Sequence, residues 1–155
     1  MAAKAINGST ALVFGGTAGI GYASAEALLR QGLPQLVIVG RNADKGEAAR
    51  GRLANAFPQA NIRFMACDAM QPGAVETVVD AAADHMGAID ILVSSAGGDP
   101  MPRLLHTIPL EEVMPTLTQI SSGVILPARA VLPHMTKQGG GAVICFASDA
   151  AKIAT

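Results

Sequence analysis

The sequence predicts an α/β fold in which a doubly wound parallel sheet lies between two layers of helices. Two observations predict it. Five short apolar runs alternate with helical segments along the chain, and a glycine-rich turn separates the first run from the first helix. This alternation is typical of right-handed βαβ crossovers, which build a parallel sheet with helices on both faces. Ligands of such sheets bind beyond the carboxyl ends of the strands, so the residues that follow each strand are the candidate site.

Length and composition indicate one globular domain over residues 1–155, with 50% hydrophobic residues to build its core. The chain has 11 basic and 12 acidic residues, which gives no basic surplus for nucleic acid or an anionic membrane. No apolar run approaches the ~20 residues of a membrane span, and the N-terminal residues lack the apolar core of a signal peptide. We therefore expect a soluble, cytoplasmic protein.

The first unit consists of a strand over Thr10 to Gly15 and a helix that starts at Ile20 and stops before Pro34. Between them lies a turn, Gly15 to Gly21, that is rich in glycine. Glycine has no Cβ, so main-chain N–H groups and the positive end of the following helix can closely approach a pyrophosphate. The turn is therefore a candidate phosphate site, although such glycines can also serve only close packing of a strand and a helix.

The next two units repeat the pattern of an apolar strand followed by a helix. The second strand, residues 36–39, precedes a helix over 44–57 with a charged face, which Pro58 closes. The third strand, residues 62–67, precedes a helix that begins near Pro72 and ends at Gly87. Arg41 and Asp68 follow these strands and therefore lie at the edge where ligands are expected.

The last two strands are predicted at 89–93 and 142–147. The loop over 99–109 between the fourth strand and the next helix is longer than most such connections, so it is a candidate for binding. The helix is expected over 110–138, with kinks or a late start because three prolines lie inside it: Pro115, Pro127 and Pro133.

Cysteine and histidine provide no metal or redox motif. Cys67 and Cys145 lie far apart in apolar stretches, which indicates small core residues. The three histidines do not cluster with carboxylates at ligand spacing, so no metal is predicted. His106 and Arg103 lie in the long loop and are the exceptions that could border a substrate pocket.

The chain resembles the short-chain dehydrogenase/reductase family over its whole length. The turn has the spacing Gly-x-x-x-Gly-x-Gly, and Asp68 follows the third strand. Ser94-Ser95-Ala96-Gly97 stands where the family commonly has Asn-Asn-Ala-Gly, and Ser148 follows the fifth strand. The resemblance implies a Rossmann-like three-layer α/β/α fold and an oxidoreductase that transfers a hydride between NADP(H) and an alcohol or carbonyl substrate.

The resemblance also assigns roles to single residues. Asp68 would help to seat the adenine, and Ser148 would be the catalytic serine that hydrogen-bonds the substrate oxygen. The plainer alternative for Ser148 is a polar residue that merely ends a buried strand. The expected cofactor-binding residues are Gly15, Thr17, Ala18, Gly19, Ile20, Gly21, Arg41, Asp68, Ala69, Ser95, Ala96 and Gly97.

Arg41 bears on the choice of cofactor. In these folds the end of the second strand contacts the adenosine ribose, and a carboxylate there would bind its 2′-hydroxyl. Gly40 occupies that position and Arg41 follows it, and a guanidinium can pair with a 2′-phosphate. We therefore expect NADP(H) rather than NAD(H), the alternative being a solvated arginine.

The chain departs from the family in its catalytic residues. The family uses a Tyr-x-x-x-Lys motif, whereas the only tyrosine is Tyr22, in the first helix. We expect that motif beyond Thr155, in a longer polypeptide that also supplies the C-terminal strands and helices, and we expect the 155 residues alone to be inactive. Ile120 stands where the family often has an asparagine that relays protons, and Gln119 or Ser121 could substitute only if the helix is shifted by one residue.

The resemblance and the departures from it also bear on the expected partners and on an alternative function. The apolar long loop favours a hydrophobic small-molecule alcohol or ketone as substrate, and the complete protein is expected to be a homo-oligomer, a dimer or tetramer. The absence of the C-terminal elements would leave hydrophobic surface exposed. The alternative function is a non-catalytic nucleotide-binding or structural partner subunit of the same fold. A serine activated by Lys152 near Ser148 is a further, less specific possibility.

Overall fold

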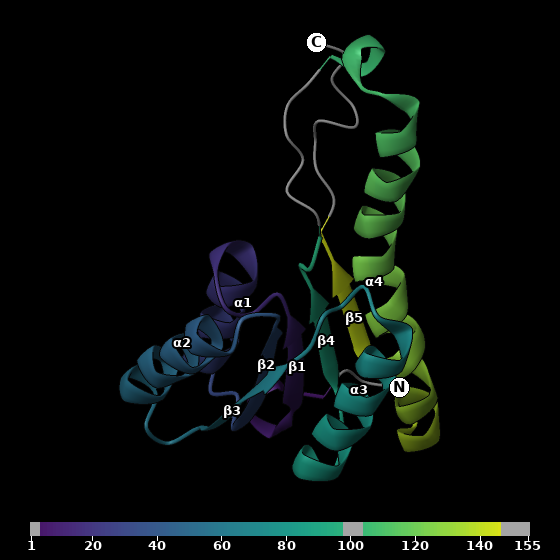
Figure 1. Ribbon diagram of the computed structural model, residues 1–155. Coiled ribbons are helices and arrows are strands. Elements are labelled where there is room, and N and C mark those ends of the chain that lie inside the picture. The colour runs from purple at the N-terminus through teal and green to yellow at the C-terminus, as the bar shows by residue number, and fades with distance from the viewer. Residues whose placement is uncertain (1–3, 98–103, 147–155) are drawn as a thin grey trace.

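The computed structural model describes residues 4–97 and 104–146. Its centre is a sheet of five parallel strands in the order β3-β2-β1-β4-β5 (Figure 1). The strands are β1 (Thr10–Phe14), β2 (Gln35–Gly40), β3 (Asn61–Ala66), β4 (Ile91–Ser94) and β5 (Ala142–Cys145). The order reverses beside β1, so the carboxyl ends of β1 and β4 border the crevice in which such sheets bind ligands.

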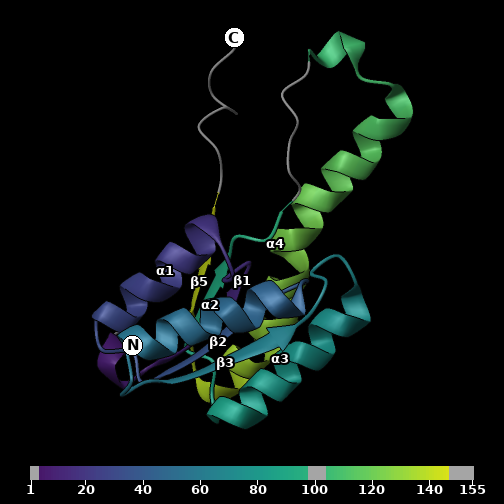
Figure 2. The same ribbon diagram turned by 60° about the vertical axis from the view of Figure 1, so that its left-hand side comes forward.

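Helices cover both faces of this sheet (Figures 1 and 2). Helices α1 (Gly19–Arg30) and α2 (Ala43–Ala56) lie on one face, and α3 (Pro72–Met86) and α4 (Leu110–Gln138) lie on the other. Two short 3-10 helices, η1 (Ile6–Gly8) and η2 (Leu105–Thr107), complete the described elements. The doubly wound three-layer fold predicted from the sequence is thereby confirmed.

The alternation of side chains along the strands divides the core into two clusters. On β1, Ala11 and Val13 pack with α1 and α2, whereas Leu12 and Phe14 pack with α3 and α4. All four are fully buried because β1 is the central strand, with helices on both sides. The apolar run that predicted this strand is therefore what a strand buried on two faces requires.

Strand β5 forms the exposed edge of the sheet and corrects one expectation. The prediction of a buried core position holds for Cys67, which is 7% exposed, but it is wrong for Cys145, which is exposed. The reason is that β5 pairs with β4 alone among the described strands, and its neighbours Val143 and Ile144 are 39% and 44% exposed. An apolar strand sequence predicts burial only when other elements cover the strand.

Helix α4 runs through all three prolines without the late start that the sequence suggested. It changes direction in its upper part and projects beyond the sheet (Figure 2). Pro127 has no N–H, so it cannot bond the carbonyl of Gly123 one turn earlier. The hydroxyl of Ser94 donates to that carbonyl at 2.5 Å instead, which joins the end of β4 to α4. None of the described helices, α4 included, is both long and apolar enough to cross a membrane.

Candidate functional site

A cleft of about 310 Å³ opens at the carboxyl ends of the strands. It brings together all of the expected cofactor-binding residues except Gly19, Ile20 and Gly21, which form the first turn of α1. Residues of β1, β2 and α4 and of the segments that follow β3 and β4 therefore converge on one hollow. Its lining comprises Phe14, Gly15, Thr17, Ala18, Val39, Gly40, Arg41, Cys67, Asp68, Ala69, Met70, Ser95, Ala96, Gly97 and Gln119.

The glycine-rich turn is held against the neighbouring strand. Gly15 and Gly16 both donate their N–H groups to the carbonyl of Val39, at 2.9 and 3.2 Å. Gly15 has a φ of +76°, which favours glycine. Gly21 has a different reason to be glycine, because a Cβ there would overlap the Gly15 carbonyl and the Ser95 hydroxyl. The turn thus combines a bent backbone with close packing of α1 on the strand ends.

The N-terminus of α1 faces this site without a side-chain cap. Its N-cap residue, Ala18, makes no side-chain hydrogen bond, and the first turn contains no acidic residue. The N–H of Tyr22 is bonded to the Ala18 carbonyl at 3.1 Å, one turn into the helix. The N–H groups of the first turn therefore carry the positive partial charge of the helix end, which suits an anion at the cleft.

Thr17 and Gly40 lie against each other at the rim of the cleft, next to Arg41. A Cβ added to Gly40 would lie 2.6 Å from the Thr17 methyl carbon, so no larger residue fits unless Thr17 moves. Arg41 is exposed and, among the described residues, has no ion-pair or aromatic partner. Each of the other described arginines has a side-chain partner: Glu26, Glu47 and Glu76 form ion pairs, Tyr22 a cation–π contact, and His85 a hydrogen bond.

The end of β3 supplies a carboxylate and a thiol. Asp68 is half-buried, and its Oδ1 accepts the N–H of Met70 at 3.1 Å, which fixes the orientation of the carboxylate. Burial, and secondarily the charge of Asp68, raise the pKa of the Cys67 thiol above its ordinary value. Cys67 therefore lines the cleft as a neutral group, a position that the sequence analysis did not select.

The two serines at the end of β4 join this strand to β1 and to α4 by hydrogen bonds. The N–H and the hydroxyl of Ser95 both donate to the Phe14 carbonyl, at 3.0 and 3.1 Å, which ties β4 to β1. Ser94 is 1% exposed and bonds Gly123 of α4. Ala96 and Gly97 then turn along the cleft. This short segment positions the cleft floor between the central strands and α4.

Helix α4 contributes Gln119 to the cleft, and this residue was not among the expected cofactor contacts. Ile120, at the family's asparagine position, is 44% exposed and does not line the cleft. The other unexpected lining residues lie at the ends of strands or, like Met70, in the segment that follows a strand, and the sequence did contain this signal. Gln119 could not be found in that way, since its place depends on how α4 packs.

Several predicted residues fall outside this site or outside the described chain. Ser148, Lys152 and Arg103 lie outside the described residues. His106 is exposed in η2, and Tyr22 of α1 lies beneath Arg52, whose Cζ is 5.0 Å from the ring centre.

Over residues 4–97 and 104–146, no group of three or more His, Cys, Asp or Glu side chains could hold a metal ion.

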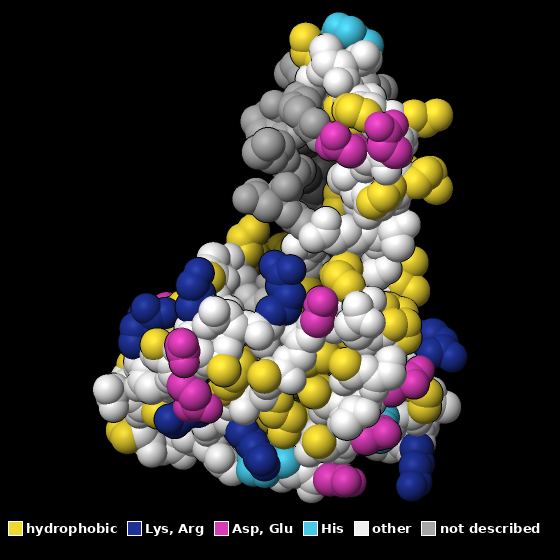
Figure 3. All heavy atoms as spheres, in the orientation of Figure 1, with side chains coloured by type: hydrophobic (Ala, Val, Ile, Leu, Met, Phe, Trp, Pro, Cys, Tyr) yellow, Lys and Arg dark blue, Asp and Glu magenta, His cyan; other side chains and the backbone are white. Residues whose placement is uncertain are grey.

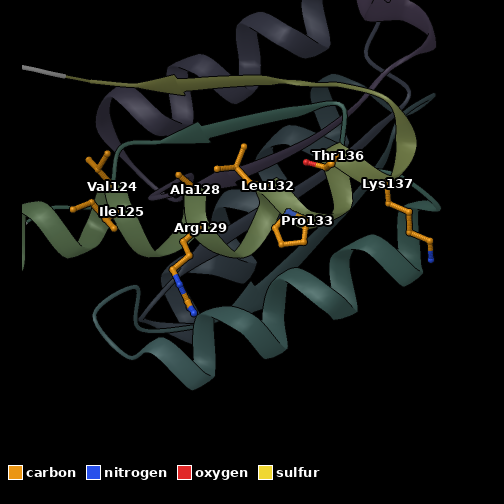
Figure 4. Close-up of a pocket in the computed structure, with 8 residues that line it drawn as sticks. All are labelled: Val124, Ile125, Ala128, Arg129, Leu132, Pro133, Thr136 and Lys137. Atoms are coloured by element: carbon orange, nitrogen blue, oxygen red, sulfur yellow. The ribbon is translucent and has the colours of Figure 1, made fainter.

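A second, larger hollow of about 770 Å³, the α4 groove, lies along α4 (Figure 4). Its lining is mostly apolar, and its guanidinium group, on Arg129, is paired with Glu76 at 2.7 Å. It therefore lacks the converging polar groups of the strand-end cleft, and we assign the candidate site to the cleft. The lining residues are Val124, Ile125, Ala128, Arg129, Leu132, Pro133, Thr136 and Lys137.

The fold and the cleft define a dinucleotide-binding α/β protein, because a glycine turn, an uncapped helix N-terminus and the strand ends meet at the reversal of strand order. The sequence matches the short chain dehydrogenase family over residues 9–155. The chain belongs to that family.

Individual relatives show the same relationship. D-threitol dehydrogenase of Mycolicibacterium smegmatis is 36% identical over 151 residues, which are 96% of this chain and 56% of that protein. The 2,3-dihydro-2,3-dihydroxybenzoate dehydrogenase of Bacillus subtilis is 33% identical over 159 residues, which are 99% of this chain and 57% of that protein. The chain thus spans little more than half the length of these curated relatives.

Solved structures agree with the fold. An NADPH-bound short chain oxidoreductase of Pseudomonas aeruginosa PAO1, described as containing an atypical catalytic center, superimposes with a TM-score of 0.88 at 28% identity. The match covers 94% of this chain and 56% of that one. NAD⁺-bound xylitol dehydrogenase gives a TM-score of 0.89 at 26% identity, covering 98% of this chain and 57% of its own.

Proposed function

We propose that these residues are the cofactor-binding part of a short-chain dehydrogenase/reductase that interconverts an alcohol and a carbonyl compound. The observation that carries the proposal is the cleft at the strand ends, where an uncapped helix N-terminus meets Arg41 and Asp68. The family membership and the dehydrogenase names of the relatives support an enzyme. They favour it over a non-catalytic partner subunit of the same fold.

A nicotinamide cofactor, when bound, supplies or accepts the hydride. The residues of this chain have the tasks of binding and orientation. The first-turn N–H groups of α1 hold the pyrophosphate, and Asp68 accepts a hydrogen bond from the adenine. Ala96 and Gly97 present a surface without long side chains, so the cofactor can lie close to the strand ends.

NADP(H) is the cofactor that the rim of the cleft favours. A carboxylate side chain in place of Gly40, which would bind the ribose hydroxyls, would fit only if Thr17 moved, because the Thr17 methyl carbon lies 2.6 Å from the position of its Cβ. The Arg41 guanidinium next to it is not engaged by a described side chain, and it can pair with a 2′-phosphate through two hydrogen bonds. NAD(H) has no phosphate at this position and gains nothing from Arg41.

The test is a calorimetric titration of the chain with NADPH and with NADH. NADPH is expected to bind about ten-fold or more tightly, since a charge-assisted pair contributes about 1.5–3 kcal/mol. Arg41→Ala should remove the preference, and Arg50→Ala, which alters an arginine on the outside of α2, should retain it. Equal affinities in the unaltered chain would refute the role of Arg41.

The remaining expectations belong to the complete protein. We propose that Ser148 hydrogen-bonds the substrate oxygen, that the substrate is a hydrophobic alcohol or ketone, and that residues 1–155 form one domain of a cytoplasmic protein. Because Tyr22 lies in α1 and Ile120 cannot relay a proton, the 155-residue chain should bind cofactor without oxidising NADPH with any carbonyl compound. Turnover by this purified chain would overturn that statement.

Exposed apolar residues on α4 support our proposal of a homo-oligomer. Leu110, Met114 and Leu117 are 80%, 63% and 53% exposed, and Figure 3 shows hydrophobic side chains along the part of α4 that projects beyond the sheet. Exposed apolar side chains grouped on one element are typical of surfaces that bind another protein chain. Sedimentation equilibrium tests the proposal, and a strictly monomeric complete protein would contradict it.

A further inference from the structure

We propose that two copies of this chain associate through one face of α4, with the two helices antiparallel and the twofold axis next to Ile125. The inference rests on the homo-oligomer proposed above, because it assigns the contact surface and the orientation of the partner copy. The residues of this face form the α4 stripe, which consists of Met114, Leu117, Ser121, Ile125, Ala128 and Leu132.

The spacing of these six residues keeps them on one side of the helix. They follow one another at intervals of three, four, four, three and four positions. This is an 11-residue pattern, whose period of about 3.67 residues nearly matches the ~3.6 residues of an α-helical turn. The residues of α4 that are buried against the rest of the chain belong to another side of the helix, namely Gly123, Pro127, Val131 and Met135.

The α4 stripe exposes apolar side chains along much of the helix. Met114, Leu117, Ile125 and Leu132 are 63%, 53%, 58% and 51% exposed. Two hollows lie along the stripe and share Ile125: the α4 groove, and a hollow of about 340 Å³ that extends from Ile125 to Met114. An apolar surface that continues through two hollows is suited to bind a protein chain.

A second copy fits this surface because the order of the stripe is nearly the same when it is read from either side of Ile125. Leu117 lies eight positions before Ile125, and Leu132 lies seven positions after it. Ser121 lies four positions before Ile125, and Ala128 lies three positions after it. An antiparallel partner therefore places Leu117 against Leu132 of the partner copy. The small residues Ser121 and Ala128 then face each other, so the two helices can approach closely.

The charges at the two ends of α4 favour the antiparallel orientation. The first turn contains Glu111 and Glu112, and the last turn contains Lys137. Glu111 and Lys137 have no ion-pair partner within residues 4–97 and 104–146. Glu111 lies 14 positions before Ile125 and Lys137 lies 12 positions after it, so antiparallel pairing brings opposite charges together. A parallel partner would instead place like charges side by side and would align the two helix dipoles unfavourably.

Sedimentation equilibrium of the unaltered chain gives the dissociation constant of the dimer. Ile125→Asp should raise this constant at least about ten-fold, because the residue occurs twice at the centre of the interface. Ile120→Asp is the matched control, since Ile120 is 44% exposed on the same helix but is not part of the α4 stripe. This control should leave the constant unchanged.

Cysteine cross-linking tests the orientation, in a Cys145→Ser background that removes the exposed native thiol. Under oxidation, a mixture of Leu117→Cys and Leu132→Cys chains should form a disulfide-linked dimer. Neither variant should do so alone, because antiparallel pairing holds each residue far from its own counterpart. Lys137→Glu should weaken the dimer about three- to ten-fold, and the addition of Glu111→Lys should restore it.

The outcomes separate this inference from the proposals on which it depends. A monomeric unaltered chain would overturn the homo-oligomer and the inference together. A dimer that Ile125→Asp weakens no more than Ile120→Asp does would overturn the inference alone, as would self-linking of Leu117→Cys chains. Titration of the same proteins with NADPH tests the cofactor site separately, so its failure would overturn the proposed dehydrogenase function without affecting the α4 contact.

Discussion

Ser94 substitutes for a helical hydrogen bond that Pro127 cannot make, and this gives a prediction at the scale of single residues. Ser94→Ala leaves the Gly123 carbonyl buried without a partner, so it should lower the free energy of unfolding by about 1–3 kcal/mol. Pro127→Ala restores an N–H one turn after Gly123. In the Pro127→Ala background, Ser94→Ala should therefore lower the free energy of unfolding by clearly less.

Urea unfolding of the four proteins in this cycle measures the coupling between the two positions. A cost of Ser94→Ala that is the same in the unaltered chain and in the Pro127→Ala background would show that the hydroxyl is not replacing the missing helical bond. Far-UV circular dichroism of each variant checks that α4 remains folded.

The two cysteines should differ in their reactivity. Cys145 is exposed, whereas Cys67 is 7% exposed and burial raises the pKa of its thiol, so it holds little of the reactive thiolate. Iodoacetamide at pH 8 should alkylate Cys145 at least about ten-fold faster, as peptide mass spectrometry would show. Equal rates in the folded chain would contradict the burial of Cys67.

The raised pKa of the Cys67 thiol also predicts how the free energy of unfolding changes with pH. The folded chain keeps the Cys67 proton at a pH at which the unfolded chain, with its ordinary value of 9.0, begins to release it. This contribution to stability is therefore complete below pH 9.0 and is lost as the pH rises through the folded pKa. Cys67→Ser should weaken the fall in stability above that pH.

Single residues also mark the limit of inference from sequence. Gly15, Thr17, Arg41, Asp68 and Ala96 were expected in the cleft because they directly follow strands. Gln119 could not be placed, since a shift of α4 by one residue would put Ile120 or Thr118 there instead. The position of α4 depends on the contact between Gly123 and Ser94. These residues lie 29 positions apart in the sequence, so no local pattern specifies their contact.

At the scale of elements, helix α2 contains two glycines with opposite roles. A Cβ on Gly46 would collide with the ring of Phe64 on β3, whereas a Cβ on Gly51 would meet nothing within 4 Å. Gly51→Ala should therefore raise the free energy of unfolding by about 0.5–1 kcal/mol through helix propensity. Gly46→Ala should lower it by about 1–3 kcal/mol because the ring must move.

Thermal or urea unfolding of the two variants checks this contrast within one helix. Stabilisation by Gly46→Ala would contradict the close packing of α2 on β3, and Gly51→Ala serves as its matched control. The expected directions differ although both positions are helical glycines, so the result reports on packing rather than on backbone entropy alone.

The elements themselves were largely predictable, and the differences have physical causes. Strand β4 begins at Ile91 rather than at Ile89, because the Asp90 carboxylate accepts the Thr10 N–H at 2.9 Å and the Lys4 ammonium at 2.8 Å. Helix α4 tolerates Pro127 because Ser94 satisfies the buried carbonyl that this proline leaves free. These compensations join residues distant in sequence, so local patterns could not predict them.

At the scale of the whole molecule, the apolar surface follows from the order of the strands. Strand β5 is at the edge of the described sheet, and its apolar side chains Val143 and Ile144 are exposed. The sequence predicted both the sheet and an uncovered apolar surface, but which residues form that surface depends on the packing of α4 and β5. The strand-end cleft therefore differs in chemistry from the α4 groove: the cleft has a mixed polar and apolar lining, whereas the lining of the α4 groove is mostly apolar.

The most direct test of our account is to map NADPH binding on the ¹⁵N-labelled chain by chemical-shift perturbation. We predict saturable shifts at the amides of Gly15 to Gly21, at Asp68 to Met70 and at Ser95 to Gly97, with the amides of Val124 to Lys137 unaffected. Shifts confined to the α4 groove, or no saturable shifts at all, would contradict the assignment of the dinucleotide site to the strand-end cleft.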